Sequence, residues 1–431
     1  MQCIIKPSNL SGSISAPPSK SCMQRALAAA LICKGKTILQ NTCMSDDSRV
    51  AKSIIQNLGA VITDLSSNSI QIVSEGFPHD FFPRDKKIQI FCGESGLSTR
   101  MFAPIAALCT NEIIFRGEES LQKRPMDFFD AIFPFLNTKI QSDNGKLPIH
   151  FQGPLIPKNI EIDCAAGSQY LTGLLMAFSA ANTAGITISV NNLKSAGYIG
   201  LTLDVMKKFG MPVPDFTNYS SFYFNGEAAI NLPQQRMYTI EGDWSGSAFL
   251  LVAGAIAGNI SITGLDTQSQ QPDKVIVEVL ESCGATILHK DDSIEISKSP
   301  LTAFHFDATG CPDLFPPLAA LAACCEGISS IKGVHRLVHK ESNRAEAIQQ
   351  ELRKMSVDIH IENDDMIIKG GSQIQQAIIH SHGDHRIAMM SAVVALAANG
   401  ETKIQHAEVV GKSFPGFFKS LQSFGAAISF E

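Results

Sequence analysis

The stretch SGSAFLLVAGAIAG, residues 245–258, carries small and apolar residues on every face of a helix and ends at a glycine. A segment of this kind is typical of a helix that is buried on all sides. Five other stretches of the same character recur along the chain at a spacing of roughly 70 to 75 residues. They are MQRALAAALICKG (23–35), STRMFAPIAALCT (98–110), SQYLTGLLMAFSAANTAG (168–185), LFPPLAALAACCEG (314–327) and DHRIAMMSAVVALAANG (384–400). The sequence therefore predicts six repeated units.

The flanks of these helices predict the rest of each unit. A short β-like run follows each helix, as in ITISVNN (186–192), and in most units an amphipathic helix then ends at glycine. A hairpin with a polar turn usually comes next. Another strand precedes the apolar helix, as in NIEIDC (159–164) and MYTIEG (237–242). The predicted unit is strand–helix–strand–helix–strand–strand.

The predicted fold class is α/β, with two domains that each contain three such βαβαββ units. A single unit leaves an apolar helix face uncovered, whereas three units can enclose one core. One long solenoid is the alternative, but the polar stretch PQQRMYTIEG (233–242) near the chain midpoint favours two domains.

The chain ends predict where the domains divide. Residues 1–18 are strand-like as far as Pro17 and Pro18, and the last unit carries only part of its closing hairpin. We therefore expect residues 19–236 to form the first domain, and residues 1–18 with 237–431 to form the second. Two crossings, near 16–19 and 232–238, suggest a hinge with a cleft.

Composition excludes several classes of protein. The chain has 431 residues, 45% of them hydrophobic and 18% charged, and its net charge of −6 gives no reason to bind nucleic acid or an anionic membrane. The eleven cysteines lie scattered in apolar runs, which indicates a reduced, cytosolic protein. The N-terminal residues do not read as a signal peptide, and no apolar run reaches the length of a membrane span.

The junctions between strand and apolar helix predict an anion site. They read PPSKSCMQR, CGESGLSTR, CAAGSQY, EGDWSGS, ATGCPDLF and HGDHRIA. Helix N-termini carry unpaired N–H groups and partial positive charge, although Ser, Asp and Gly at one junction are more simply helix caps. Several cations lie near such junctions, which favours a small polyanionic ligand. They are Lys20, Arg25, Arg100, Lys340, Arg344 and Arg386, and two more cations stand in the stretches SLQKRPMDF (Arg124) and VVGKSFPGF (Lys412).

Two carboxylates, Asp313 and Glu341, stand among these cations. They fit acid–base catalysis beside bound anions, but Asp313 also fits a helix cap and Glu341 an ion pair with Arg344. The sequence leaves these interpretations even. His380, His382 and His385 give only a weak zinc signal without a matching ligand set, so we predict no metal and no cofactor.

The sequence resembles the 5-enolpyruvylshikimate-3-phosphate synthases over almost its whole length. The motifs that carry the resemblance are PPSKSCMQRAL, GESGLSTRMF, KRPM, GSQYLTGLLM, SAGYIGLTLDVM, EGDWSGSA, HKESNRAEA, GDHRIAM and GKSFPGF. The resemblance implies the family's inverse α/β barrel fold, with the active site in the cleft between the domains. It also implies a monomer of the shikimate pathway that joins phosphoenolpyruvate to shikimate 3-phosphate.

The resemblance assigns residues to each substrate. Shikimate 3-phosphate contacts would fall on Lys20, Ser21, Arg25, Ser168, Gln169, Ser195, Tyr198, Asp313 and Lys340. Phosphoenolpyruvate contacts would fall on Lys20, Gly96, Arg124, Gln169, Arg344, His385, Arg386 and Lys412. The catalytic residues would be Lys20, Asp313 and Glu341.

Four positions depart from the commonest bacterial pattern of the family: Glu94, Leu97, Gly167 and Arg336. A carboxylate near a substrate anion is repulsive, so we expect Glu94 to turn away or to meet an arginine. The rival interpretations are the sister transferase that acts on UDP-N-acetylglucosamine, a non-catalytic anion-binding protein, and a metal hydrolase that uses the histidine cluster. The sister family has a Lys-Asn pair where this chain has Lys20 and Ser21.

Overall fold

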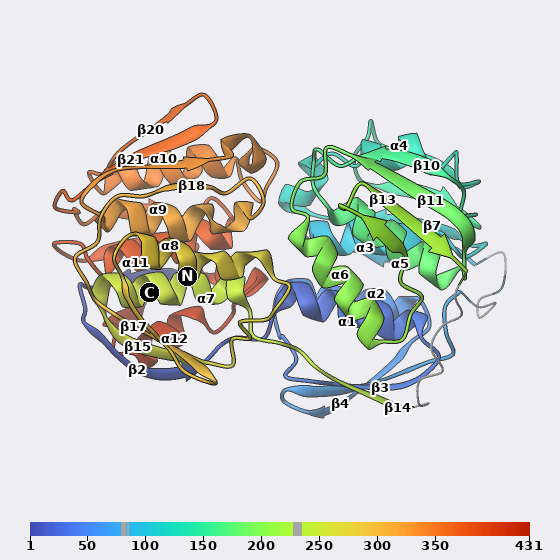
Figure 1. Ribbon diagram of the computed structural model, residues 1–431, viewed down its shortest axis with the longest axis horizontal. Coiled ribbons are helices and arrows are strands. Elements are labelled where there is room, and N and C mark those ends of the chain that lie inside the picture. The colour runs from blue at the N-terminus through green and yellow to red at the C-terminus, as the bar shows by residue number, and fades with distance from the viewer. Residues whose placement is uncertain (79–82, 84–85, 227–234) are drawn as a thin grey trace. The chain divides into compact units, whose positions relative to one another are not determined.

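The computed structural model describes residues 1–78, 83, 86–226 and 235–431 (Figure 1). Contacts divide the chain into two compact units. The continuous unit is Lys20–Ile240, and the split unit combines Met1–Ser19 with Glu241–Glu431. Each unit has its own hydrophobic core.

The continuous unit contains three repeats. Its elements are α1 (Lys20–Ile32), β3 (Gly35–Gln40), α2 (Asp46–Asn57), β4 (Val61–Ser66), β5 (Ser69–Ser74), β6 (Ile88–Phe91), α3 (Gly96–Ala106), β7 (Glu112–Arg116), η1 (Glu119–Lys123), α4 (Asp127–Ile132), β8 (Lys139–Ser142), β9 (Ile149–Gln152), β10 (Ile160–Asp163), α5 (Gln169–Ala180), β11 (Ala184–Asn191), α6 (Gly197–Lys208), β12 (Asp215–Thr217), β13 (Ser221–Asn225) and β14 (Gln235–Thr239).

The split unit also contains three repeats. Its elements are β1 (Gln2–Ile5), β2 (Leu10–Ser15), α7 (Trp244–Ala257), β15 (Gly258–Thr263), η2 (Pro272–Val275), α8 (Ile276–Ser282), β16 (Thr286–His289), β17 (Ser293–Ser297), β18 (His305–Asp307), η3 (Pro312–Leu314), α9 (Phe315–Cys324), β19 (Gly327–Lys332), η4 (Val334–Leu337), α10 (Arg344–Lys354), β20 (Asp358–Glu362), β21 (Asp365–Gly370), β22 (Ile378–His380), α11 (His385–Ala395), β23 (Thr402–Gln405), η5 (Ala407–Lys412), α12 (Phe417–Ser423) and β24 (Ile428–Phe430).

One sheet topology recurs in all six repeats. In the sheet β6-β7-β9-β8, for example, β6 is parallel to β7, and β9 is antiparallel to both β7 and β8. The parallel pair needs a crossover, which the apolar helix α3 supplies, whereas β8 and β9 form a hairpin. In the described part of the chain the strands make separate four-stranded sheets rather than one closed barrel.

Strand β2 precedes the first apolar helix along the chain and β14 precedes the fourth, but each strand pairs in the repeat that contains the other helix. This exchange corrects one expectation from the sequence. MYTIEG was expected to lead the fourth repeat, but its strand β14 pairs in parallel with β3 of the continuous unit. The strand that leads the fourth repeat is β2, which pairs in parallel with β15. Each exchanged strand supplies the parallel partner that its sheet would otherwise lack.

The exchange moves the boundaries between the units. The continuous unit begins at Lys20 instead of 19, and the split unit resumes at Glu241 instead of 237, because β14 stays with β3. Residues 232–234 of the expected second crossing lie outside the described residues.

The first strand completes the sheet of the last repeat. Strand β1 lies between β23 and β24 and is antiparallel to both, so that Ile4 faces Lys403 on one side and Ser429 on the other. It occupies the place of the hairpin strand that the sixth repeat lacks.

The small-residue helices form the centre of each core. All residues of α7 are buried, and α7, α9 and α11 pack against one another in the split unit (Figure 1). Small side chains let backbones approach closely: a Cβ on Gly173 of α5 would lie 2.7 Å from the carbonyl oxygens of Arg100 and Met101 in α3. Glycine at this position therefore sets the distance between α3 and α5.

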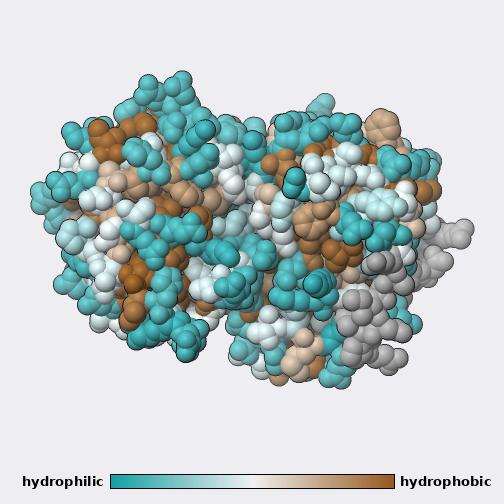
Figure 2. All heavy atoms as spheres, viewed as in Figure 1, coloured by the Kyte–Doolittle hydropathy of each residue, from teal (hydrophilic) through white to brown (hydrophobic). Residues whose placement is uncertain are grey.

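The surface of each unit is largely hydrophilic on the face that Figure 2 shows, and none of the eleven cysteines, all within the described residues, forms a disulfide. Hydrophilic residues cover much of the face of each unit that Figure 2 shows, with apolar patches among them. All eleven cysteines are free thiols. Across the described ranges, every helix is too short or too polar to cross a membrane.

Candidate active site

In the continuous unit, two arginines and a glutamine converge on the first residue of α3. A Cβ placed on Gly96 would lie 2.9 Å from Nη1 of Arg124 and 3.2 Å from Nη1 of Arg100. It would lie 3.8 Å from Oε1 of Gln169, the first residue of α5. Glycine leaves room in front of these side chains, so the start of α3 forms a cradle suited to a small anion.

Arg100 belongs to this cradle, although the sequence assigned it no substrate contact. Its Nη1 donates to Gln169 Oε1 at 2.8 Å, and its Nη2 donates to the Pro125 carbonyl at 3.2 Å. Its guanidinium lies 5.2 Å from the centre of the Tyr170 ring, within the range of a cation–π contact. Its cationic character next to a helix start was the only sequence signal.

Lys20 begins α1 and faces a carboxylate of α2. Its Nζ donates to Asp47 Oδ2 at 2.9 Å, and both side chains are about 15% exposed. Gln24, one turn later, donates to the Asp47 carbonyl and to the hydroxyls of Ser95 and Ser98. These bonds tie the starts of α1, α2 and α3 together.

Arg25 is a buried cation that links α1 to α6. Its Nε donates to Thr202 Oγ1 at 2.9 Å, and its Nη atoms donate to the carbonyls of Ser21 and Tyr198. Burial lowers the pKa of Arg25 to about 10, so the guanidinium stays charged at neutral pH. Ser195 lies two residues before α6, in the left-handed region (φ 59°), and its carbonyl accepts from the Tyr198 N–H.

In the split unit, three cations surround Asp313. Its Oδ1 accepts from Lys340 Nζ at 3.2 Å and from Arg344 Nη1 at 3.0 Å, and its Oδ2 accepts from Arg386 Nη2 at 3.3 Å. Burial, the largest influence, raises the pKa of Asp313, but the three cations outweigh it and hold the pKa well below the usual 3.8. Asp313 caps neither η3 nor α9, which removes the capping alternative.

Arg344 is held by two further carboxylates. Its Nε donates to Asp384 Oδ2 at 2.9 Å, and its Nη2 lies 2.5 Å from Glu341 Oε2. Burial lowers the pKa of Arg344, but Asp384 and Glu341 outweigh it and raise that pKa above its usual value. The expected Arg344–Glu341 ion pair is thus present, and it is part of a larger cluster.

Asp384 was missed as a site residue. It is fully buried and caps α11 by accepting from the Arg386 N–H at 2.9 Å. The sequence showed an aspartate before a helix but nothing of its bond to an arginine forty residues earlier. Asp384 therefore fixes both Arg344 and the start of the helix that carries Arg386.

The remaining predicted residues of the split unit lie around the start of α11. His385 is its first residue and is 2% exposed. Lys412, at the end of η5, donates to the Gly383 carbonyl at 2.7 Å. The rings of His380 and His382 lie 5.0 Å apart, and His382 Nε2 lies 2.6 Å from Glu351. Among the described residues, no three His, Cys, Asp or Glu side chains are placed to hold a metal ion.

Comparison with known proteins identifies the family. The family model described as EPSP synthase (3-phosphoshikimate 1-carboxyvinyltransferase) matches residues 4–421. The 3-phosphoshikimate 1-carboxyvinyltransferase of Clostridium novyi is 34% identical over 98% of this chain and 97% of its own. That of Methanocorpusculum labreanum is 33% identical over 99% of each. The chain belongs to the EPSP synthase family.

Solved structures of the EPSP synthase fold agree. An EPSP synthase from Acinetobacter baumannii superposes with a TM-score of 0.82 at 24% identity over 99% of both chains. The enolpyruvyl transferase NikO from Streptomyces tendae gives a TM-score of 0.76 at 16% identity, over 99% of this chain and 98% of its own. At these identities the likeness concerns the fold.

The departures from the EPSP synthase pattern have local explanations. Glu94 turns toward Ser120, whose hydroxyl donates to it at 2.6 Å. Gly167 has φ 133°, a conformation that favours glycine, and its N–H already bonds to the Cys164 carbonyl. Leu97 is 9% exposed and belongs to the core. Burial lowers the pKa of Arg336 and a nearby Asp313 opposes this, so Arg336 adds to the same charge cluster.

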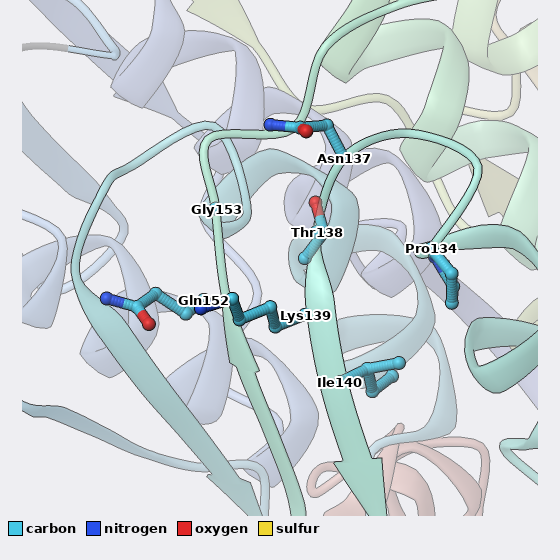
Figure 3. Close-up of a pocket in the computed structure, with 7 residues that line it drawn as sticks. All are labelled: Pro134, Asn137, Thr138, Lys139, Ile140, Gln152 and Gly153. Atoms are coloured by element: carbon cyan, nitrogen blue, oxygen red, sulfur yellow. The ribbon is translucent and has the colours of Figure 1, made fainter.

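A cavity elsewhere in the continuous unit contains none of the predicted EPSP synthase site residues. It has a volume of about 500 Å³ and lies where β8 begins and β9 ends (Figure 3). Its lining consists of Pro134, Asn137, Thr138, Lys139, Ile140, Gln152 and Gly153.

Proposed function

We propose that this chain transfers the carboxyvinyl group of phosphoenolpyruvate to the 5-hydroxyl of shikimate 3-phosphate and releases phosphate. Membership of the EPSP synthase family supports the reaction. The observation that carries the proposal is the charge cluster of the split unit, where Asp313 meets three cations and Glu341 shares one of them. A non-catalytic anion-binding protein has no need for two carboxylates among its cations.

The cations divide between the anionic groups of phosphoenolpyruvate. Arg344 and Arg386 suit its carboxylate because a guanidinium binds two oxygens at once. Lys20 and Lys412 suit its phosphate as point charges, and Arg124 suits it as a planar donor of several hydrogen bonds. Gly96, Gln169 and His385 complete the assigned contacts.

The buried arginine of the continuous unit supports binding of shikimate 3-phosphate. Arg25 holds Ser21 and Tyr198 through their carbonyls, which brings three of the assigned residues together. Ser195 joins them through Tyr198. Ser168 and Gln169 at the start of α5, and Lys20, Asp313 and Lys340, complete the assigned set.

The chemistry is addition followed by elimination. Asp313 accepts the proton of the 5-hydroxyl, the hydroxyl oxygen bonds to C2 of phosphoenolpyruvate, and C3 gains a proton from the protonated Glu341 carboxyl to become a methyl group. Phosphate then leaves the tetrahedral adduct while Glu341 takes a methyl proton. Lys20 assists proton transfer and the departure of phosphate. The products are the enolpyruvyl ether and phosphate.

The low pKa of Asp313 bears on when it acts as a base. Its three cations keep it ionised, but they also weaken its attraction for a proton. When substrate anions take over part of the attraction of Lys340 and Arg386, the pKa of Asp313 rises toward a value that suits proton transfer. The base is therefore activated by the substrates that it serves.

Phosphate release tests the proposal. The purified protein is mixed with shikimate 3-phosphate and phosphoenolpyruvate, together and singly. We expect release only when both are present, and UDP-N-acetylglucosamine should not replace shikimate 3-phosphate. Asp313→Asn and Glu341→Gln should each lower kcat by at least a hundredfold. Asp364→Asn is the matched control, because Asp364 pairs with the exposed His335. Full activity in either catalytic variant contradicts the assigned roles.

We further propose that the two units act as the two three-repeat domains of a cytosolic monomer that needs no metal or cofactor. The free thiols support a reducing environment. Activity that survives a chelator, and a single species of one-chain mass in sedimentation, are the expected results.

A further inference from the structure

We propose that Glu94 acts through Ser120 as a positioning residue for Arg124, an inference that rests on the function proposed above. Glu94 lies in the turn between β6 and α3. Its Oε2 accepts from the Ser120 hydroxyl at 2.6 Å and from the Ser120 N–H at 3.3 Å. The same hydroxyl accepts from Arg124 Nη2 at 3.1 Å. The three side chains form one relay.

The relay has a fixed direction. A carboxylate only accepts hydrogen bonds, a guanidinium only donates them, and a hydroxyl carries one proton. Ser120 must therefore give its proton to Glu94, which leaves its lone pairs for Arg124. Without an acceptor at Glu94 the hydroxyl is free to rotate, and its proton can then face the arginine.

The backbone of η1 also depends on Glu94. Glu118, which precedes η1, makes no side-chain cap, so the Ser120 N–H takes its acceptor from Glu94 instead. Glu119 has φ 48°, a conformation that is unfavourable for a side chain of its kind. Arg124 follows directly after η1. Glu94 thus holds the segment that ends at Arg124.

The position of Arg124 matters because it completes the anion cradle. Its Nη1 lies 2.9 Å from the place of a Cβ on Gly96, beside Nη1 of Arg100. A negative charge this near should otherwise weaken anion binding. Positioning and repulsion predict opposite results when Glu94 is removed, which makes the inference testable.

Steady-state kinetics with varied phosphoenolpyruvate separates the two effects. Glu94→Ala and Ser120→Ala should each raise KM for phosphoenolpyruvate roughly tenfold, the size expected for one hydrogen bond to a charged group, with a smaller change in kcat. The double variant should be no worse than either single one, because both break the same relay. Glu94→Gln keeps an acceptor for Ser120 and should restore most of the affinity.

Ser120→Ala separates the relay from the support of η1, because alanine keeps the N–H that Glu94 accepts. The matched control is Gln122→Ala, which removes an exposed side chain of η1 whose amide donates to the nearby Gly117 carbonyl. It should leave KM unchanged.

Each other outcome decides against the inference. A lower KM in Glu94→Ala shows repulsion instead of positioning. A raised KM in Glu94→Ala with no change in Ser120→Ala shows support of η1 alone. If the wild-type protein releases no phosphate, the proposed function fails and takes this role with it. If the wild-type protein is active but the effects of Glu94→Ala and Ser120→Ala on KM add up in the double variant, only the relay is refuted.

Discussion

Replacing Gly173 by alanine tests how the fold sets the geometry of the site. The new Cβ would lie 2.7 Å from two carbonyl oxygens of α3, whereas ordinary contact begins at 3.4 Å. The difference, 3.4 − 2.7, means that α3 and α5 must separate by about 0.7 Å. Both obstacles are backbone atoms, so no side-chain rotation relieves the clash.

The expected cost follows from two opposing effects. Overpacking of a core costs up to about 3 kcal/mol, and alanine regains about 1 kcal/mol of helix propensity over glycine. The net loss of about 2 kcal/mol should lower the Tm of the continuous unit by roughly 4 to 8 °C. The separation also stretches the Arg100–Gln169 hydrogen bond from 2.8 Å, so we expect kcat/KM to fall at least about tenfold.

Thermal unfolding followed by circular dichroism, together with the phosphate-release assay, measures both effects. Gly310→Ala serves as the control for stability, since no atom of the described residues lies within 4 Å of a Cβ at that position. Its Tm should stay within about 2 °C. A Gly173→Ala variant with unchanged Tm and unchanged kcat/KM refutes the argument that this glycine sets the spacing of α3 and α5.

Three further outcomes are expected. Asp384→Ala leaves the buried Arg344 without its fully buried carboxylate partner and should lower the free energy of unfolding by about 3–5 kcal/mol in urea titrations; a loss below about 1 kcal/mol contradicts this. Arg25→Lys keeps the charge but loses the planar donors and should raise KM for shikimate 3-phosphate more than tenfold, with unchanged affinity counting against that assignment. Burial and two neighbouring histidines hold the pKa of His380 below 6.5, so the folded protein takes up this proton less readily than the unfolded chain. Its contribution to stability is full above pH 6.5 and is lost below it; His380→Gln should flatten that fall in Tm, and the exposed His360→Gln should not.

The repeats were predictable because the burial of a helix is visible in the composition of that segment, whereas the pairing of a strand depends on residues far away in the sequence. The small-residue helices can be recognised by their composition alone, and their spacing along the chain gives the number of units. MYTIEG carries the same alternation whether it leads the fourth repeat or pairs with β3. Its pairing partner depends on which sheet lacks a parallel strand. Which sheet this is becomes clear only in the folded units.

The site divides in the same way. Lys20, Arg344 and Arg386 were predictable as cations near helix starts, because the helix positions themselves were predictable. Their carboxylate partners were not. Asp384 lies forty residues from Arg344, and Asp47 lies 27 residues from Lys20, so only the folded chain shows that they meet.

The position of β1 between β23 and β24 has a consequence for synthesis on the ribosome. The continuous unit is complete once Ile240 has emerged, but β1 must wait for Thr402–Gln405 and Ile428–Phe430. At roughly 5–20 residues per second, the 191 residues from Glu241 to Glu431 take about 10 to 40 s to translate. During that interval the continuous unit can fold while β1 remains unpaired, because its partners β23 and β24 are translated only after that unit.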